Sequence, residues 1–241
     1  MLKNSKLAVL LLFTISLVIS GCGKKSNPAP NSSPTPAPKL IELPSDQKPY
    51  IKLTPRQDGH ELTLVIANLP EFITQIEYEL LYTAQDNGLE IEKGVGDTIK
   101  LEKPSPSIER VLLLGTSSCT NGCKYKYDTG VNGGNLSLIF YTQTNQAISF
   151  ETPFRLVSSS ELKKNQGLSL PDNSFSIKAT VTGQSDYYVL LRNFGAPKNT
   201  EASALHSVFS SGAGIGKVIS VNPDTFIKKD ATTLVGDYLQ N

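Results

Sequence analysis

Hydrophobic and polar residues alternate along most of the chain from residue 49 onward. In the clearest run, residues 75–82, apolar side chains occupy every even position: Ile76, Tyr78, Leu80 and Tyr82. Successive side chains of a β-strand point to opposite faces, so this pattern predicts a strand with one buried face. Similar runs cover residues 62–66, 136–140, 148–150 and 154–156, with shorter candidates at 50–53, 89–92, 98–101 and 110–114. The pattern predicts seven to nine short strands between residues 49 and 158.

Turn-forming residues separate these runs: Asp58-Gly59, Asn87-Gly88, Gly94-Val95-Gly96 and Asn132-Gly133-Gly134. Glycine and asparagine adopt the positive φ angles of tight turns more readily than other residues. Short strands joined by such turns predict an all-β fold, an antiparallel β-sandwich. The pattern resembles the immunoglobulin and fibronectin type III class at the level of the fold. The chain has no tryptophan, however, and no cysteine pair spaced to bridge two sheets.

The alternation stops between residues 158 and 167, where the sequence is polar, and then returns. We therefore expect an interdomain connection between a β-sandwich domain at 49–158 and a small β-rich module at 168–241. Within this module we expect one or two helical turns at 201–206, a strand pair formed by 208–209 and 217–221, and a frayed end at 232–241. A module of about 75 residues is small enough to depend on packing against the sandwich.

The first 21 residues have the pattern of a secretion signal. Lys3 and Lys6 precede an apolar run at residues 7–19 that only Thr14 and Ser16 interrupt. A run of this length fits the apolar region of a signal peptide and is too short to cross a bilayer as a permanent helix. We therefore expect residues 1–21 to be a signal peptide that directs export.

The apolar run ends in Ile19-Ser20-Gly21-Cys22. This motif resembles the lipobox of bacterial lipoproteins, in which an aliphatic residue and two small residues precede a cysteine. The resemblance implies cleavage before Cys22, lipidation of its sulfur, acylation of the new amino terminus, and a place on the extracytoplasmic face of the cell membrane or the outer membrane. Several acyl chains on one cysteine anchor a protein durably, whereas one chain alone binds weakly. The alternative is an ordinary signal peptide or signal anchor with an incidental cysteine.

Residues 22–48 contain six prolines, at positions 28, 30, 34, 36, 38 and 44. Proline lacks a backbone N–H and has a fixed φ, so this spacing excludes a helix and a sheet ladder. We expect a disordered, extended, lipid-anchored linker of about 3.1 Å per residue, which holds the folded part away from the lipid headgroups.

The charge balance narrows the classes of partner. The chain has 23 basic and 22 acidic side chains, and removal of Lys3 and Lys6 with the signal leaves 21 and 22, a net charge of −1. Nucleic-acid binding needs an excess of positive charge, so we expect no nucleic-acid partner. Two histidines and three cysteines are too few for a multi-metal site, and the glycines at 212, 214 and 216 lack the spacing of a phosphate-binding loop. We therefore expect no metal and no cofactor.

Cys119 and Cys123 form an even pair once Cys22 carries lipid. Exported chains meet an oxidising environment, and Asn121-Gly122 supplies a turn that brings residues four apart within disulfide distance. We expect a structural disulfide that stiffens one loop and contributes about 2 kcal/mol. Free thiols or redox chemistry are the alternatives, although redox sites use a C-x-x-C spacing. A metal site here would need two further ligands.

The candidate bases of an enzyme are His60, beside the Asp58-Gly59 turn, and His206. The chain has no G-x-S-x-G motif, but a Ser-His-Asp triad stays open because its members need not be close in sequence. Glu77 and Glu79 lie on the outer face of a predicted strand, where we expect solvated charges rather than a glycosidase pair. We predict no catalytic residues.

Two further groups have ordinary structural explanations. Residues 128–135 carry oxygen donors beside a turn but lack the alternating acidic residues and closing glutamate of an EF-type calcium loop. Four tyrosines are candidate contact residues of an interface, with packing on a sheet face as the alternative: Tyr125, Tyr127, Tyr187 and Tyr188.

These observations predict a membrane-anchored extracytoplasmic lipoprotein with a non-catalytic role. It would be a binding or scaffolding module displayed on a stalk, with the membrane and a protein of the envelope or the cell surface as partners. Two alternatives stay open: an envelope hydrolase whose site is assembled from residues distant in sequence, and a subunit of an envelope assembly whose C-terminal module docks to a partner.

Overall fold

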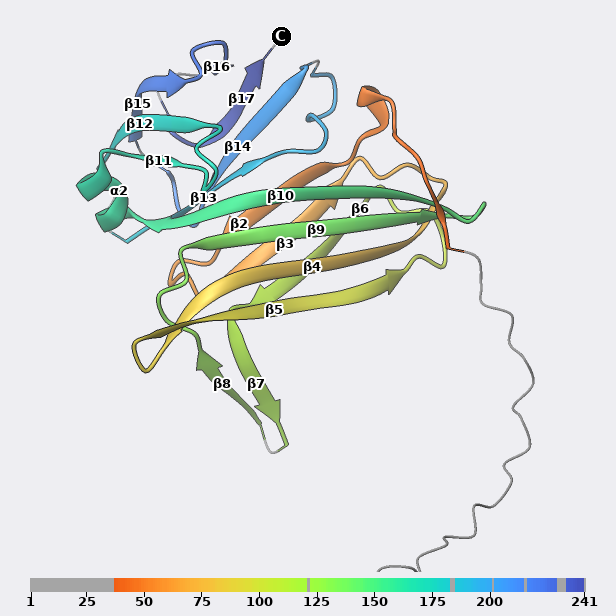
Figure 1. The fold of residues 1–241 in the computed structure, drawn as a ribbon, viewed down its shortest axis with the longest axis horizontal. Helices are drawn as coiled ribbons and strands as arrows, with labels where there is room; N and C mark the ends of the chain where they lie inside the picture. Colours follow the sequence, from red (N-terminus) through yellow and green to blue (C-terminus); the bar gives the residue numbers. More distant parts are fainter. Residues whose placement is uncertain are drawn as a thin grey trace, which may run out of the picture. The chain divides into compact units, whose positions relative to one another are not determined.

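The computed structural model describes residues 37–120, 122–182, 185–200, 202–214, 216–228 and 233–240 (Figure 1). Cys22, the signal segment and the linker up to residue 36 lie outside the described residues, so the lipoprotein interpretation stays a prediction. The disordered linker does not extend to residue 48 as predicted, because Lys39–Leu40 pairs with a strand of the central sheet and Leu43 is buried in the core. Among the residues that are described, no helix is long and apolar enough to cross a membrane. From Pro38 onward the chain forms one compact unit.

The described chain is mostly antiparallel β-structure, which confirms the all-β sandwich fold class. Its central sheet has nine described strands in the order β16-β17-β14-β13-β10-β9-β4-β5, with β1 paired in parallel to β10. These strands are β1 (Lys39–Leu40), β4 (Ile73–Asp86), β5 (Leu89–Lys100), β9 (Gly133–Thr142), β10 (Gln146–Ser158), β13 (Tyr187–Arg192), β14 (Ala204–Ser210), β16 (Ile227–Lys228) and β17 (Gly236–Gln240). This sheet alone has more strands than either sheet of an immunoglobulin domain, so the resemblance to that class is one of sandwich architecture.

Three smaller sheets complete the described fold. The first contains β2 (Tyr50–Pro55), β3 (Glu61–Ala67) and β6 (Ser107–Leu113). The second contains β11 (Gly167–Ser169), β12 (Ser176–Val181) and β15 (Gly216–Asn222). The third is a separate hairpin of β7 (Gly115–Cys119) and β8 (Cys123–Tyr127). A short 3-10 helix, η1 (Ser45–Gln47), and one α-helix, α2 (Ser159–Asn165), are the described helices.

The two three-stranded sheets cover opposite faces of the central sheet. Strand β13 shows this directly, because Val189 and Leu191 belong to the hydrophobic core under β2-β3-β6, whereas Tyr188 and Leu190 belong to the core under β11-β12-β15. All four side chains are fully buried. A strand that is covered on both faces loses its alternation and becomes a continuous apolar run.

The β11-β12-β15 sheet covers only part of its face of the central sheet. Its core contains residues of β10, β13, β14 and β17 but none of the described residues of β4, β5 or β9. On those three strands, alternate residues are half-buried or exposed and predominantly polar, such as Glu77, Glu79 and Ser137. One face of the central sheet is therefore open to solvent over β9-β4-β5.

Several predicted elements are wrong. The pair Gly94 and Gly96 does not form a turn, since residues 89–100 form the single strand β5. A Cβ on Gly96 would lie 2.6 Å from the backbone oxygen of Tyr78, and one on Gly94 would lie 2.9 Å from the Leu81 side chain. Because Gly94 and Gly96 have no side chain, β5 can lie close to β4 at these positions, as glycine permits within a sheet.

The C-terminal part differs from the prediction in three ways. The expected helical turns at 201–206 are replaced in the described residues by the start of strand β14. Strands β14 and β15 do not pair with each other, because β14 lies between β13 and β17 and β15 pairs with β12. The chain end does not fray: β17 pairs with β14, and Tyr238 is fully buried.

The polar stretch predicted as an interdomain connection forms helix α2. Ser158 caps it by accepting a hydrogen bond from the backbone N–H of Glu161 at 3.2 Å, and Gln166 ends it in a left-handed conformation. Polar capping residues of this kind define helix ends rather than linkers. The boundary between 49–158 and 168–241 stays a prediction, and the central sheet runs across it through the β10–β13 pair.

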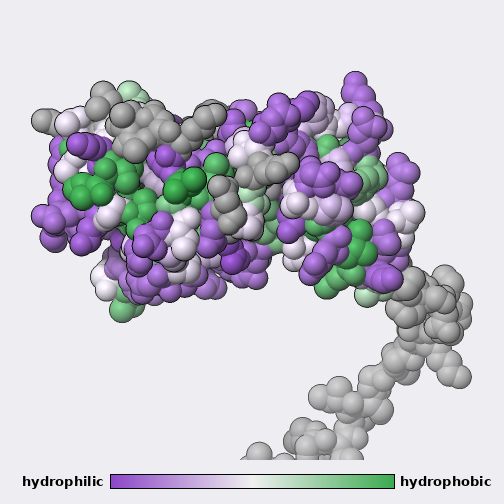
Figure 2. Space-filling view, turned by 90° about the horizontal axis from the view of Figure 1, so that it is seen from above, coloured by the Kyte–Doolittle hydropathy of each residue, from purple (hydrophilic) through white to green (hydrophobic). Residues whose placement is uncertain are grey.

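Seen from above, the surface is largely hydrophilic and its hydrophobic residues form separate patches (Figure 2). The exposed large apolar side chains among the described residues are correspondingly scattered over different elements: Leu40, Phe72, Leu89, Val111, Tyr125, Ile219 and Ile227. These side chains therefore do not form one large apolar patch, and each has to be considered with the element that carries it.

Candidate functional site

The β7–β8 hairpin is the feature of the fold that packing does not explain. Its two strands pair only with each other, from Gly115 opposite Tyr127 to Cys119 opposite Cys123. None of its strand residues is buried. In Figure 1 the hairpin extends from the sandwich beyond strand β5. It therefore has two open edges and no hydrophobic core of its own.

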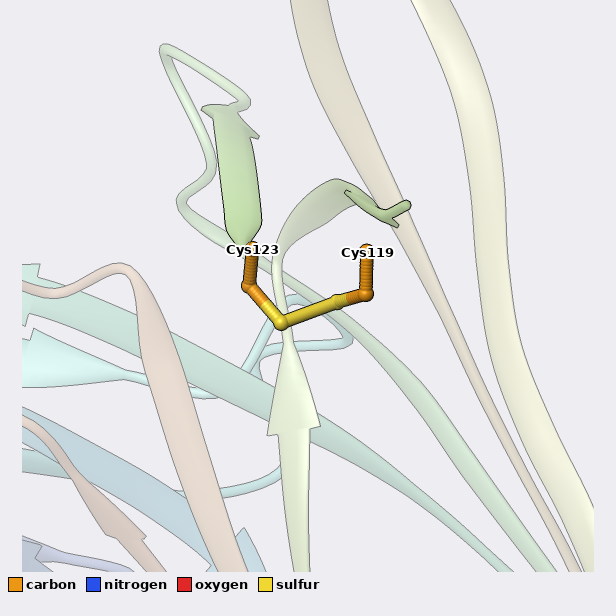
Figure 3. Close-up of a disulfide and its surroundings, with 2 residues drawn as sticks. All are labelled: Cys119 and Cys123. Atoms are coloured by element: carbon orange, nitrogen blue, oxygen red, sulfur yellow. A yellow bond between two sulfur atoms is a disulfide. The ribbon is translucent and has the colours of Figure 1, made fainter. Parts of the chain in front are cut away.

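A disulfide closes the hairpin near its tip (Figure 3). Cys119 and Cys123 are register partners at the ends of the two strands, and their sulfur atoms are bonded, as the even cysteine pair predicts. An isolated two-stranded hairpin is marginally stable in water. A cross-link that limits the open conformations compensates for the missing core, and for a loop this small the model-dependent gain is about 2 kcal/mol.

The base of the hairpin is fixed by Asp128, whose side chain is 6% exposed. Tyr82 of β4 donates a hydrogen bond to its Oδ2 at 2.9 Å, and Lys93 of β5 forms an ion pair with its Oδ1. The Asp128 backbone N–H donates to the Leu114 carbonyl at 2.9 Å. Burial, together with the hydrogen bond to Asp128, raises the pKa of Tyr82 above its ordinary range. One carboxylate thus joins the hairpin to two strands of the central sheet.

The contacts of Asp128 also concern the alternative in which residues 128–135 bind calcium. Both oxygens of its carboxylate have partners within the chain, and Thr129 donates its hydroxyl to the Gln85 carbonyl at 3.2 Å. The described residues contain no cluster of three histidine, cysteine, aspartate or glutamate side chains that is suited to a metal ion. These side chains therefore have roles in positioning the hairpin.

A row of stacked rings supports one face of the hairpin. Tyr127 stacks on His60 with ring centroids 4.3 Å apart and planes 9° apart, and Tyr125 follows at 6.0 Å and 6°. The Arg56 guanidinium lies 5.4 Å from the Tyr127 ring centroid. Arg56 also donates two hydrogen bonds to Asp58, at 2.8 and 2.7 Å, which lower the pKa of Asp58 to about 2. His60, a candidate base in the sequence, lies against the hairpin as a packing residue.

The exposed part of the hairpin is basic and aromatic. Tyr125 is 52% exposed, and Lys124 and Lys126 alternate with the tyrosines along β8. Residues 115–127 contain no aspartate or glutamate. Tyrosine offers a large contact area and a polar hydroxyl with few rotatable bonds, and it is enriched at protein interfaces. The hairpin thus presents a preorganised contact surface of one charge sign.

His206, the second candidate base, lies in the core under β11-β12-β15. The residue is 5% exposed, and its imidazole stacks on Phe175 with ring centroids 4.1 Å apart. Neither ring nitrogen has a hydrogen-bond partner in the described structure. Burial, reinforced by Arg192, lowers its pKa to about 4. Among the residues described, the ring of neither His60 nor His206 forms a hydrogen bond to a serine or a carboxylate.

The remaining candidates divide between core and surface. Tyr188 is fully buried, and Tyr187 covers Gly59. Glu77 accepts hydrogen bonds from Tyr141 at 2.8 Å and Gln75 at 3.1 Å on the outer face of β4. The glycine-rich stretch that begins at Gly212 connects β14 to β15. None of these arrangements in the described residues brings two catalytic side chains together.

The sequence did not reveal a buried polar network around Asn193. Its side-chain oxygen accepts from the Ile51 N–H at 2.8 Å, and its amide donates to the Ile51 carbonyl at 2.7 Å and to Ser207 at 3.0 Å. Ser207 and Tyr50 in turn donate to one oxygen of Asp237, at 2.6 and 2.9 Å. The network joins β2 to β14, β17 and the residue that follows β13, so its role is to hold the layers together.

A cleft of about 830 Å³ lies beside this network, lined in part by Lys48, Phe150, Arg192 and Phe194. Phe150 and Phe194 stack at 4.7 Å, and Lys48 Nζ lies 5.3 Å from the Phe194 ring centroid. The unpartnered buried polar atoms of the described residues belong to Tyr188 and His206, which do not line the cleft. The cleft thus lacks a buried group aimed at a ligand, unlike the hairpin with its exposed contact residues.

The chain matches no protein-family model and no curated protein. Among solved structures it is similar to a hypothetical protein from Pyrococcus horikoshii OT3. The two are 16% identical over 47% of this chain and 94% of that one, with a TM-score of 0.25. A similarity at this level carries no argument about function. The functional assignment therefore depends on the residues of this chain.

Proposed function

We propose that the chain is a membrane-anchored extracytoplasmic lipoprotein with a non-catalytic role, in which the β7–β8 hairpin binds a protein partner. The observation that carries the proposal is a coreless hairpin fixed at both ends. The Cys119–Cys123 disulfide closes its tip, and Asp128 holds its base. This reinforcement does not serve the packing of the sandwich, because the hairpin strands contribute no buried residue to the sandwich.

The chemistry of the hairpin supports a protein as the partner. Preorganised elements lose less entropy on binding than flexible ones, and Tyr125 and Tyr127 are held parallel before any partner arrives. Both hairpin strands have an unpaired edge, which offers backbone donors and acceptors to an incoming strand. Lys124 and Lys126 favour an acidic surface.

The anchor in this proposal is supported by the sequence. The lipobox resemblance at Ile19-Ser20-Gly21-Cys22 implies a lipid on Cys22, and the proline-rich residues that follow suit a spacer. Export of the chain also agrees with the disulfide, since disulfides persist in oxidising compartments. The three features together support the proposal that the folded part is tethered outside the cytoplasm.

Site-specific photo-crosslinking in intact cells tests the binding role. A benzophenone amino acid replaces Tyr125, which is 52% exposed, in one variant and Ile219, an apolar residue of β15 that is 62% exposed, in a control variant. We expect a discrete crosslinked protein from position 125 and none from position 219. Absence of any product from position 125, with export and abundance unchanged, would contradict the proposal.

The anchor is tested separately by the mass of the native protein. We expect an amino terminus at Cys22 that carries acyl chains, and release of the Cys22→Ala variant from the membrane fraction. A protein that retains its first methionine, or an unmodified Cys22 sulfur in the membrane-bound form, would refute the lipid anchor and leave the test of the hairpin unaffected.

A further inference from the structure

The uncovered face of β9-β4-β5 is acidic. In an antiparallel sheet, residues directly opposite each other point to the same face. The register places four glutamates of β4 and β5 on this face, Glu77, Glu79, Glu90 and Glu92, and Glu151 of the adjoining strand β10 on the same side of the sheet. None of the five has an ion-pair partner among the described residues. Lys100 is on the same face at the end of β5, while Arg155 is engaged by Glu161. The face therefore carries an excess of unpaired negative charge.

This face also contains a hollow. A depression of about 620 Å³ is lined by Glu77, Glu79, Leu81, Gly94, Gly96, Thr98, Ser137 and Ile139, together with neighbouring backbone. Gly94 lies opposite Leu81 and Gly96 opposite Glu79, so β5 offers no side chain at two successive outward positions. Aromatic rings characteristically cover glycines of this kind in sheets. The hollow combines a glycine floor, apolar walls and an acidic rim.

The β7–β8 hairpin has the complementary properties. It carries Lys124 and Lys126 without an ion-pair partner in the described structure, and Tyr125 is half exposed. The hairpin cannot reach the hollow of its own chain while Tyr127 is stacked on His60, which holds it beside the β2–β3 turn. The two surfaces are therefore both available for contact between separate copies.

We propose that the hairpin of one copy docks into the acidic hollow on β9-β4-β5 of a second copy. This inference rests on the proposed function of the hairpin and names its partner. Tyr125 covers Gly94 and Gly96. Lys124 and Lys126 leave the other face of β8, and their long side chains reach round its open edge to the glutamates of the rim. Because the two surfaces differ, the contact is heterologous, and it links anchored copies head to tail along the membrane.

Zero-length crosslinking between isotopically different copies tests the contact. The full chain is purified in detergent in unlabelled and nitrogen-15-labelled form, mixed in equal amounts, and treated with a carbodiimide that joins lysines to carboxylates in direct contact. We expect mixed-isotope peptides in which Lys124 or Lys126 is joined to Glu77, Glu79 or Glu92. Mixed-isotope peptides without these lysines, or links within one isotope alone, would overturn the proposal.

Charge reversal tests its specificity. We expect K124E/K126E and E79K/E92K each to weaken self-association about tenfold or more, and an equimolar mixture of the two variants to associate again. In the mixture the reversed hairpin of the first variant can pair with the reversed hollow of the second, and the native hairpin of the second with the native hollow of the first. The control K178E/K217E makes the same charge change on exposed strands β12 and β15, and we expect it to leave association unchanged. Failure of the mixture to associate would overturn the proposed contact.

The outcomes separate this inference from the function on which it rests. A crosslink from position 125 to a different protein, with no link between copies, supports the binding role of the hairpin and overturns the homotypic contact. A crosslinked product with twice the mass of the chain supports both. No product of either kind contradicts both.

Discussion

The chain contains two hairpins that are stabilised in opposite ways. The β4–β5 hairpin has twelve register pairs and turns at Asn87-Gly88, where both residues have positive φ angles of 50° and 81°. Its inward residues, such as Ile76 and Leu80, are fully buried in the core. The β7–β8 hairpin has five register pairs and buries no residue. It depends on a disulfide, on Asp128 and on the stacked rings of His60 and Tyr127.

The stability of the body, by which we mean the central sheet and the two three-stranded sheets that cover it, and the rigidity of the β7–β8 hairpin therefore have separate origins. A core residue contributes to unfolding of the whole unit, because its buried surface is exposed only when the unit opens. A cross-link in a coreless element affects local opening of that element. Substitutions in the β4–β5 hairpin should therefore affect the unfolding of the whole unit, whereas substitutions in the β7–β8 hairpin should affect mainly the local opening of that hairpin.

The largest effect is expected from Leu80→Ala in β4. This side chain is fully buried, and its truncation should lower the free energy of unfolding by about 3 kcal/mol through lost burial and a cavity. Denaturant titration measures it. Leu89→Ala is the matched control, because Leu89 is 70% exposed beside the same turn, and we expect a change within about 0.5 kcal/mol. Equal effects from the two leucines would contradict the assignment of this hairpin to the core.

A similar change in the free energy of unfolding is expected when the pH is lowered, because His206 is buried in the core of the body. Its imidazole faces Phe175 and Phe226, with Arg192 and Tyr238 as register partners on the flanking strands and Asp172 opposing the shift. The pKa falls from its ordinary value of 6.5 to about 4 in the folded chain. Between these pH values the unfolded chain binds the proton more tightly than the folded one. Stability is therefore full above pH 6.5 and declines toward pH 4, by up to roughly 3 kcal/mol.

The variant His206→Phe isolates this contribution. It keeps the stacking on Phe175 and removes the titrating group, so the difference in unfolding free energy between variant and native chain should widen as pH falls from 6.5 to 4. A constant difference over that interval, measured by denaturant titration at each pH, would show that His206 does not resist protonation in the folded chain.

A smaller effect is expected from Asp128→Asn at the base of the β7–β8 hairpin. The amide keeps the shape of the carboxylate but removes the charge that pairs with Lys93. We expect a loss of about 1 kcal/mol in unfolding free energy and faster hydrogen exchange of the amides at 115–127. Asp86→Asn, at an exposed position of the neighbouring turn, serves as the control. Unchanged exchange in the hairpin would argue against Asp128 as its anchor.

The smallest global effect is expected from C119S/C123S. The hairpin contributes no buried residue and can open while the sheets stay folded, so we expect the step in which the central sheet unfolds after the hairpin has opened to change by less than about 0.5 kcal/mol. Amide exchange within the hairpin should accelerate about 30-fold, which corresponds to the roughly 2 kcal/mol expected of this loop closure. A large loss of global stability would mean that the hairpin belongs to the body after all.

The two hairpins also differ in how well the sequence predicted them. Ile76, Tyr78, Leu80 and Tyr82 show the period of two that identifies a strand, and Asn87-Gly88 identifies its turn, so the first half of β4–β5 was predicted correctly. The β5 strand was divided in two because Gly94 and Gly96 are turn formers in isolation. Only the neighbouring Leu81 and the Tyr78 backbone show why glycine is needed there.

Long-range contacts set the other limits of sequence-based prediction. The cysteine pair predicted the tip of the β7–β8 hairpin because its members are four residues apart. Its base escaped prediction, since Asp128 lies 46 residues from Tyr82 and 35 from Lys93. The Asn193 network joins Ile51 across 142 residues, and no local pattern marks such a contact. The continuity of the central sheet across residue 158 was hidden for the same reason.

The most direct test of the central claim is the yield of photo-crosslinked partner from position 125, measured in cells with the disulfide intact and in the C119S/C123S variant. If a disulfide-stiffened hairpin is the binding element, the yield should fall severalfold in the variant while the abundance and fold of the body stay unchanged. Equal yields from the two chains would contradict the claim, as would a stronger product from position 219.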